Sequence, residues 1–169
     1  DWVAERLEAI GFQVEQTRYR DHRNLEKVNV VGRRDPVTTT KGGPPGFAYF
    51  AHTDVVPADR WTGPGGDPFA PVVSEGRLYG RGACDMKGSL ATMLASAEQV
   101  SAVGQRGPLW IVCTADEEVG FVGAKHMVKH SEGYRELVAA QPVCVIGEPT
   151  QLKVVHAHKG IVGMQITSH

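Results

Sequence analysis

LWIVCTADEEVG, residues 109–120, places an apolar run directly before three adjacent carboxylates. The run is typical of a strand buried on both faces, as in the sheets of α/β proteins. Asp116, Glu117 and Glu118 repel one another, and the end of a buried strand is a poor place to hydrate all three. An acidic loop facing water is the ordinary interpretation of such a charge run. The choice between a solvated loop and a cation site therefore depends on the rest of the chain.

Composition limits the class of protein. The chain has 169 residues, 41% of them hydrophobic, and a net charge of -1, as expected for one soluble domain with a substantial core. This charge gives no reason to expect a nucleic acid or a membrane as partner, and the apolar runs are too short to span a bilayer. The cysteines, Cys84, Cys113 and Cys144, form no CxxC pair, so we expect a reducing, cytoplasmic location.

Helical and strand patterns alternate along the chain. Apolar residues at helical spacing predict helices over 2–10, 86–103 and 121–130. Strands are predicted over 12–15, 28–31, 47–51, 109–115, 143–146 and 152–157. Residues 35–46 and 57–71, rich in Gly and Pro, read as loops. This order predicts an α/β fold with a mostly parallel sheet sandwiched between helices.

Ligand-type side chains follow three of these strands. The strand over 47–51 leads to His52 and Asp54, the strand over 109–115 leads to the three carboxylates, and the strand over 143–146 leads to Glu148. In α/β sheets, ligands bind at the carboxyl ends of the strands. Solvated loops would not be expected to repeat this arrangement three times. The sequence therefore predicts a metal site at one edge of the sheet.

Two further residues fit such a site. His52 and Asp54 are two positions apart, so their side chains point the same way from a strand, and a carboxylate there can accept the second ring N–H of a metal-bound imidazole. Asp85 stands in GRGACDMKG, residues 80–88, at the start of a predicted helix. An ordinary helix N-cap would explain this aspartate equally well if the motif stood alone. Beside the other clusters, a ligand role is favoured.

Five motifs together resemble the acetylornithine deacetylase and succinyl-diaminopimelate desuccinylase family of dinuclear zinc metallopeptidases, whose order and spacing they follow along essentially the whole chain. They are AHTDVVP (51–57), LYGRGACDMKGSLA (78–91), TADEEVG (114–120), VIGEPT (145–150) and AHKG (157–160). The second motif is more similar to the desuccinylases, and the last three are more similar to the deacetylases. The resemblance implies a zinc-peptidase-like catalytic domain.

The resemblance also implies a role for each matching residue. His52 and Glu148 would hold one zinc ion, Glu118 the other, and Asp85 would bridge them; Co or Mn are possible substitutes. Glu117 would act as general base on a metal-bridging water, and Asp54 would orient His52. A cis peptide bond is implied between Asp85 and Met86.

The same resemblance predicts the domain organisation. Residues 1–159 would form the N-terminal portion of the catalytic domain, and residues 160–169 the first strand of a truncated lid and dimerisation domain. Both ends of the chain read as cut, with the rest of the lid missing. A late histidine ligand and a lid histidine for the oxyanion would lie outside this chain. The full-length protein would be a homodimer.

The predicted function is hydrolysis of the amide bond of N-acyl amino acids. A dipeptidase or carboxypeptidase of the same family is an alternative, and so is a non-catalytic domain that binds a metal or a partner. HxD with a distant His also occurs in two-His-one-carboxylate iron oxygenases, usually on all-β barrels. The predicted helices and the additional carboxylates disfavour that class.

Four other histidines and one cysteine are weaker candidates for a metal ligand or a nucleophile. His156 and His158 would lie on one side of a strand, and His126 and His130 have helical i, i+4 spacing. No carboxylate motif accompanies the second pair, so an exposed helix face is favoured. Cys84 has no base in its motif and is expected to be a small packed residue.

Overall fold

The computed structural model describes residues 2–38, 43–100, 102–157, 160 and 167. The helices are α1 (Trp2–Ala9), α2 (Lys87–Gln99), α3 (Val122–His130) and α4 (Glu132–Ala140). The strands are β1 (Gln13–Arg20), β2 (Glu26–Arg34), β3 (Phe47–His52), β4 (Val72–Ser74), β5 (Arg77–Tyr79), β6 (Leu109–Thr114) and β7 (Val143–Ile146).

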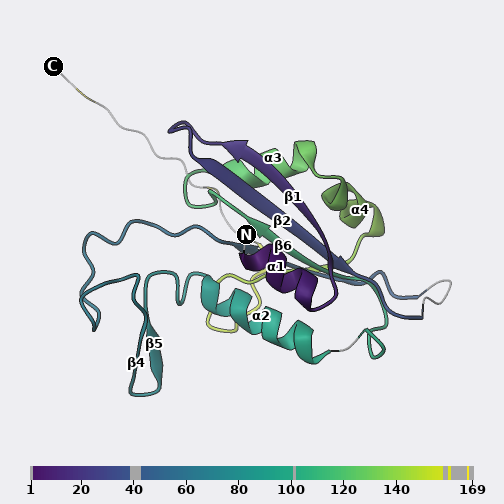
Figure 1. The fold of residues 1–169 in the computed structure, drawn as a ribbon, viewed down its shortest axis with the longest axis horizontal. Helices are drawn as coiled ribbons and strands as arrows, with labels where there is room; N and C mark the ends of the chain where they lie inside the picture. Colours follow the sequence, from purple (N-terminus) through teal and green to yellow (C-terminus); the bar gives the residue numbers. More distant parts are fainter. Residues whose placement is uncertain (1, 39–42, 101, 158–159, 161–166, 168–169) are drawn as a thin grey trace.

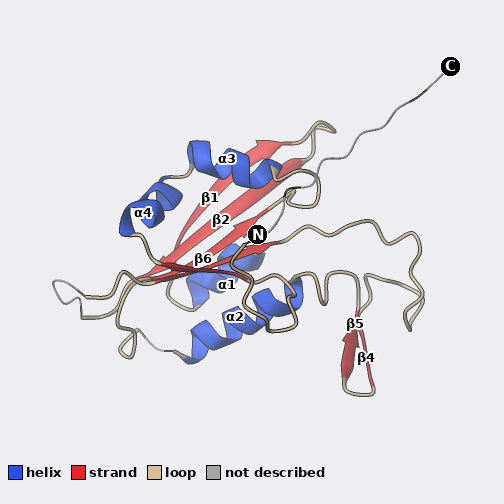
Figure 2. Ribbon diagram, turned by 180° about the vertical axis from the view of Figure 1, so that it is seen from behind, coloured by secondary structure: helices blue, strands red, loops and turns tan. Residues whose placement is uncertain are grey.

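A five-stranded sheet in the order β1-β2-β6-β3-β7 forms the centre of the molecule (Figure 1). β3 pairs in parallel with both β6 and β7, while β2 is antiparallel to both β1 and β6. β2 is therefore the one strand of this sheet that runs against the others. Helices α1 and α2 cover one face and α3 and α4 the other, as the view from behind also shows (Figure 2). The predicted α/β sandwich with a mostly parallel sheet is confirmed.

Strand β6 shows why both faces need helices. Leu109, Ile111 and Cys113 pack into the core beneath α1 and α2. Trp110 and Val112, which alternate with them, pack into the second core beneath α3 and α4. Side chains of a strand point alternately to the two faces, so a strand that is apolar throughout must be buried on both.

The sequence missed several elements. The predicted strands over 12–15 and 28–31 are parts of the longer β1 and β2, the predicted helix over 86–103 ends at Gln99, and α4 and the β4–β5 hairpin were not anticipated. The hairpin stands apart from the main sheet in both views. The segment over 143–146 forms β7 as predicted, but its side chains are exposed because β7 is an edge strand.

The strand predicted over 152–157 is wrong. These residues form no strand, and Leu152 and Val154 are almost fully exposed. Gln151 and Leu152 adopt left-handed backbone conformations, and the amide of Lys153 donates to the carbonyl of Thr150 at 3.1 Å. The chain therefore turns where the apolar pattern suggested a strand. The predicted lid strand over 160–169 and His158 lie outside the described residues, apart from positions 160 and 167.

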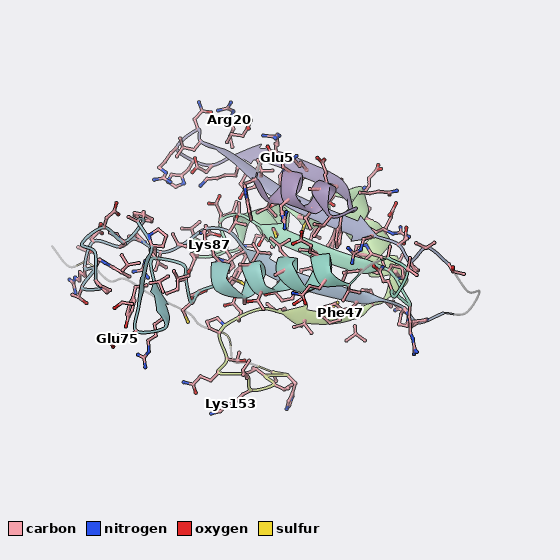
Figure 3. The ribbon with its side chains drawn as sticks, turned by 60° about the horizontal axis from the view of Figure 1, so that its bottom comes forward. Glu5, Arg20, Phe47, Glu75, Lys87 and Lys153 are labelled. Atoms are coloured by element: carbon pink, nitrogen blue, oxygen red, sulfur yellow. The ribbon has the colours of Figure 1, made fainter. Side chains whose placement is uncertain are left out.

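The carboxyl end of β3 lies beside the start of α2. Phe47, at the start of β3, and Lys87, at the start of α2, lie at opposite ends of the sheet (Figure 3). The Lys87 ammonium donates to the carbonyl of Thr53, just beyond β3, at 2.6 Å. The carboxyl end of β3 and the start of α2 therefore meet, as the metal-site prediction requires.

Candidate metal centre

Parallel pairing brings the three motif-bearing turns to one edge of the sheet. His52 at the end of β3 is opposite Thr114 at the end of β6, and Phe50 is opposite Ile146 at the end of β7. The residues that follow these strands therefore leave the sheet side by side, in accordance with the rule for parallel strands.

His52 is the centre of a first group of ligand atoms. Its Nε2 lies 3.0 Å from Asp85 Oδ1 and 3.7 Å from Glu148 Oε1. The imidazole is 2% exposed, whereas the Asp85 and Glu148 side chains are 51% and 38% exposed. A buried nitrogen thus faces two carboxylates that are open on the solvent side.

A second group contains His52, Glu117 and Glu118, whose ligand atoms lie within 4.8 Å of one another, as do those of the first group. His52 therefore lies near ligand atoms of Asp85 and Glu148 in one group and of Glu117 and Glu118 in the other, while the ligand roles inferred for these residues stay predictions. Asp85 and Glu118 belong to different groups, so the bridge between two metals that was inferred for Asp85 stays a prediction.

Asp54 contacts both halves of this cluster, although differently from the expectation. The His52 Nδ1 lies 3.1 Å from the main-chain carbonyl oxygen of Asp54 and 3.6 Å from its carboxylate. The carboxylate instead accepts the main-chain amides of Glu117 and Glu118, at 3.1 and 3.0 Å. The ring is therefore oriented by the backbone of Asp54, while its side chain fixes the acidic turn.

Asp85 does not cap the following helix. The N-cap position of α2 is Met86, which makes no side-chain capping hydrogen bond. The Asp85 carboxylate lies against His52 instead, and the Asp85–Met86 peptide bond is cis, as predicted. The fully buried Met86 thioether accepts the main-chain amide of His52 at 3.2 Å.

A serine that sequence reasoning missed joins two of the turns. Ser89 Oγ, in the first turn of α2, lies 3.2 Å from the carbonyl oxygen of Met86 and 2.5 Å from that of Gly147. The Tyr49 hydroxyl lies 2.8 Å from the same Oγ. Gly147 is required here, because a Cβ at this position would come within 1.8 Å of the Tyr49 hydroxyl oxygen. Ser89 stands within the motif at residues 78–91, and its place there is the signal that could have found it.

Crowding of the carboxylates changes their acidity. Burial raises the pKa of Glu117, and the charges of Glu148, Glu118 and Asp54 raise it further. Burial also raises the pKa of Glu148, with added repulsion from Asp85 and Glu118. Burial opposes protonation of His52, but the hydrogen bonds to Asp85 and Asp54 and the nearby glutamates outweigh it, so the His52 pKa is raised.

These features match what a divalent metal requires. Imidazole nitrogen and carboxylate oxygens are zinc ligands in proteins, and a cation among the carboxylates would remove the repulsion that raises two of their pKa values. His52 has its second ring nitrogen already hydrogen-bonded, which fixes the tautomer that leaves Nε2 for a metal. The residues present therefore fit a metal ion.

The weaker candidates stay outside this cluster. The His126 ring stacks on Tyr19 and on His130, with centroids 4.8 and 4.4 Å apart, and neither histidine belongs to a metal-type group among the described residues. His156 is exposed and in no strand. Cys84 is exposed, so the expectation that it is packed is wrong.

A cavity of about 240 Å³ adjoins the cluster. Its lining includes His52, Glu117 and Glu148 of the cluster, together with apolar side chains such as Phe121, Val128 and Ile146. The cavity therefore offers both apolar and carboxylate contacts to a small organic molecule.

Comparison with known proteins supports this picture. The chain is 39% identical, over 161 residues, to an acetylornithine deacetylase from Myxococcus xanthus, covering 95% of this chain and 38% of that protein. Its fold is similar to human carnosine dipeptidase 1 (TM-score 0.67, 23% identity) and to a metallo-carboxypeptidase from Sulfolobus solfataricus (0.63, 19%), each match covering 86% of this chain and 31% of the other. The chain thus spans well under half the length of these relatives. Residues 48–166 match peptidase family M20/M25/M40, and the chain belongs to this family.

Proposed function

We propose that this chain carries the metal-binding and general-base residues of a metal-dependent hydrolase that cleaves the amide bond of N-acyl amino acids. The observation that supports this most is the convergence of His52, Asp85, Glu118 and Glu148 around one edge of the sheet, with Glu117 beside them.

The proposed ligands are His52, Asp85 and Glu148 for one ion and Glu118 for a second, with Asp85 shared. Zinc is proposed, with Co or Mn as substitutes. When bound, such ions polarise the amide carbonyl and lower the pKa of a nearby water.

Glu117 is proposed as the general base. It takes a proton from the attacking water and gives it to the leaving amine, which then departs as a neutral molecule. Burial of its side chain raises the pKa of Glu117, which brings the carboxylate closer to the operating pH and favours both transfers. Asp54 keeps Glu117 and Glu118 in place through their amides.

The substrate class rests on the relatives. The name of the Myxococcus relative supports an N-acetyl amino acid, whereas the fold similarity to dipeptidases keeps a dipeptide or a carboxypeptidase substrate as the alternative. The succinylated substrate of the desuccinylases is a further alternative.

Location, partners and domains follow from the same proposal. Within the described ranges, none of the helices combines the length and the apolar character needed to cross a bilayer. A cytoplasmic location is proposed from the free cysteines. We also propose that residues 1–159 are catalytic-domain sequence, that residues 160–169 begin a lid, and that the whole protein is a homodimer without nucleic-acid or membrane partners.

A hydrolysis screen of the protein as the cell makes it tests this function. N-acetyl, N-succinyl and dipeptide substrates are compared with and without added zinc, and Glu117→Gln is expected to lower kcat by about 10²–10⁴-fold while zinc remains bound. Glu75→Gln, at the tip of the β4–β5 hairpin, serves as control (Figure 3). Bound zinc with no turnover of any substrate would favour the non-catalytic alternative.

A further inference from the structure

Asp116, the first of the three adjacent carboxylates, belongs to neither ligand group among the described residues. It is 5% exposed and faces the β1–β2 hairpin instead. Its Oδ1 lies 3.0 Å from the Lys27 ammonium, and its Oδ2 accepts the Tyr19 hydroxyl at 2.8 Å. A buried carboxylate needs such partners, since an unpaired one is costly. The cation opposite Asp116 is therefore a lysine of the protein itself.

The backbone at Asp116 is also unusual. Its φ is +54°, in the left-handed region that residues with a Cβ seldom occupy. Its carbonyl accepts the amide of Val122, at the start of α3, at 3.1 Å. One residue earlier, the amide of Ala115 donates to Asn29 Oδ1 at 3.1 Å. The turn is thus fixed from the hairpin side at the point where the chain changes direction toward Glu117 and Glu118.

We propose that Asp116 is a positioning residue, which Tyr19 and Lys27 clamp so that Glu117 and Glu118 reach the cluster; this rests on the proposed function. The clamp acts from the hairpin side, and the Asp54 carboxylate acts from the β3 side. Catalytic groups must be placed to within a fraction of an ångström, so loosening either side moves the base and a ligand together.

Two further contacts hold Lys27 and Tyr19 in place. Asp21 lies 3.6 Å from the Lys27 ammonium and shares it with Asp116. The His126 ring stacks on Tyr19 and limits the positions of the phenol. Burial, together with the hydrogen bond to Asp116, raises the pKa of Tyr19, so the hydroxyl stays a donor at neutral pH.

Amide hydrogen exchange and cobalt titration of this chain test the proposal. Tyr19→Phe removes one hydroxyl at constant shape, Asp116→Asn removes the charge, and Tyr79→Phe on β5 is the matched control. Tyr19→Phe is expected to speed exchange of the Glu117 and Glu118 amides by about tenfold, with the β3 and β6 amides unchanged. It should also weaken cobalt binding by about tenfold in the weaker of two sites, or at the single site if one ion binds.

A double variant tests whether Tyr19 and Asp116 act together on the exchange of the Glu118 amide. The effects of Tyr19→Phe and Asp116→Asn on the Glu118 amide should be smaller in the double variant than their sum. Unchanged exchange at the two glutamate amides in Tyr19→Phe would overturn the proposal. So would a uniform rise in exchange across the sheet, which indicates lost stability alone. Failure of the unsubstituted chain to bind cobalt would instead contradict the proposed function.

Discussion

The carboxylate of Asp54 accepts the main-chain amide of Glu118 at 3.0 Å. Its other oxygen accepts the amide of Glu117 at 3.1 Å. A side chain from the end of β3 therefore sets the backbone of the turn after β6. This contact makes the histidine side and the glutamate side of the cluster one structural unit.

Asp54→Asn should weaken this unit. The amide group of asparagine keeps one acceptor oxygen but turns an N–H₂ toward one of the two glutamate amides, so one hydrogen bond is lost. We expect a 10–100-fold loss in metal affinity or in kcat, as is usual for residues that support metal ligands. Zinc titration and steady-state kinetics measure the two effects. Asp59→Asn, in the loop between β3 and β4, is the control, and equal behaviour of the two variants would contradict the assignment.

Ser89→Ala should weaken metal binding at the His52 side. It removes the hydroxyl that lies between the carbonyls of Met86 and Gly147, the neighbours of Asp85 and Glu148. A loss of about tenfold in affinity is expected. Ser96→Ala, on the same helix, removes a hydroxyl that donates to the carbonyl of Thr92, away from both turns, and should leave affinity unchanged. Isothermal titration of both variants with zinc compares them directly, and equal affinities would show that Ser89 has no such role.

Two metal ions should bind this chain with unequal affinity. His52 belongs to both ligand groups, but its Nδ1 lies against the Asp54 carbonyl, and the remaining ring nitrogen, Nε2, can serve only one ion. The ion on the Glu118 side is then left with carboxylates. We expect at least about a tenfold difference, or 1.4 kcal/mol. Equal, tight uptake of two zinc ions in a titration would show this reasoning to be wrong.

Glu15 should make folding stability depend on pH. Its carboxylate accepts the Ser131 hydroxyl at 2.6 Å and the amides of Glu132 and Gly133, at 2.9 and 2.7 Å, at the start of α4. Burial raises the pKa of Glu15, but these hydrogen bonds lower it more, so the folded value lies below the ordinary 4.5. The stabilisation is therefore present above pH 4.5 and is lost as the pH falls through the lower folded pKa.

Replacement of Glu15 tests the direction in which its contribution to stability changes with pH. Glu15→Gln should lower the free energy of unfolding at pH 7 by about 1–2 kcal/mol, and the difference from the unsubstituted chain should shrink as the pH is lowered below 4.5. Urea unfolding across that range measures it. Glu8→Gln, on α1, is the control. A difference that grows toward acid pH would contradict the assignment.

The sequence predicted the sheet and most of the site because both depend on local patterns. Apolar strands followed by His52, Glu118 or Glu148 are visible without any knowledge of neighbours. Parallel pairing then brings them together, and the parallel arrangement itself follows from the helices between the strands.

The elements that were missed depend on contacts between distant segments. α4 carries few strongly apolar positions, and its start is fixed by Glu15 of β1, far away in the chain. Leu152 and Val154 alternate like strand residues but form no strand and are almost fully exposed, so their pattern was misleading. The clamp of Asp116 by Tyr19 and Lys27 depends on the register of the hairpin, which single residues do not reveal.

The cluster draws its side chains from turns spread between His52 and Glu148, so no short stretch of an unfolded chain presents the same set. The metal binding that we propose would therefore be coupled to the native state, and a bound ion would raise the free energy of unfolding. At free zinc a hundred times above the dissociation constant, the native state gains about 2.7 kcal/mol. A chelator would remove that contribution without changing any side chain, so with zinc bound as proposed the thermal stability of this chain would report the concentration of free zinc.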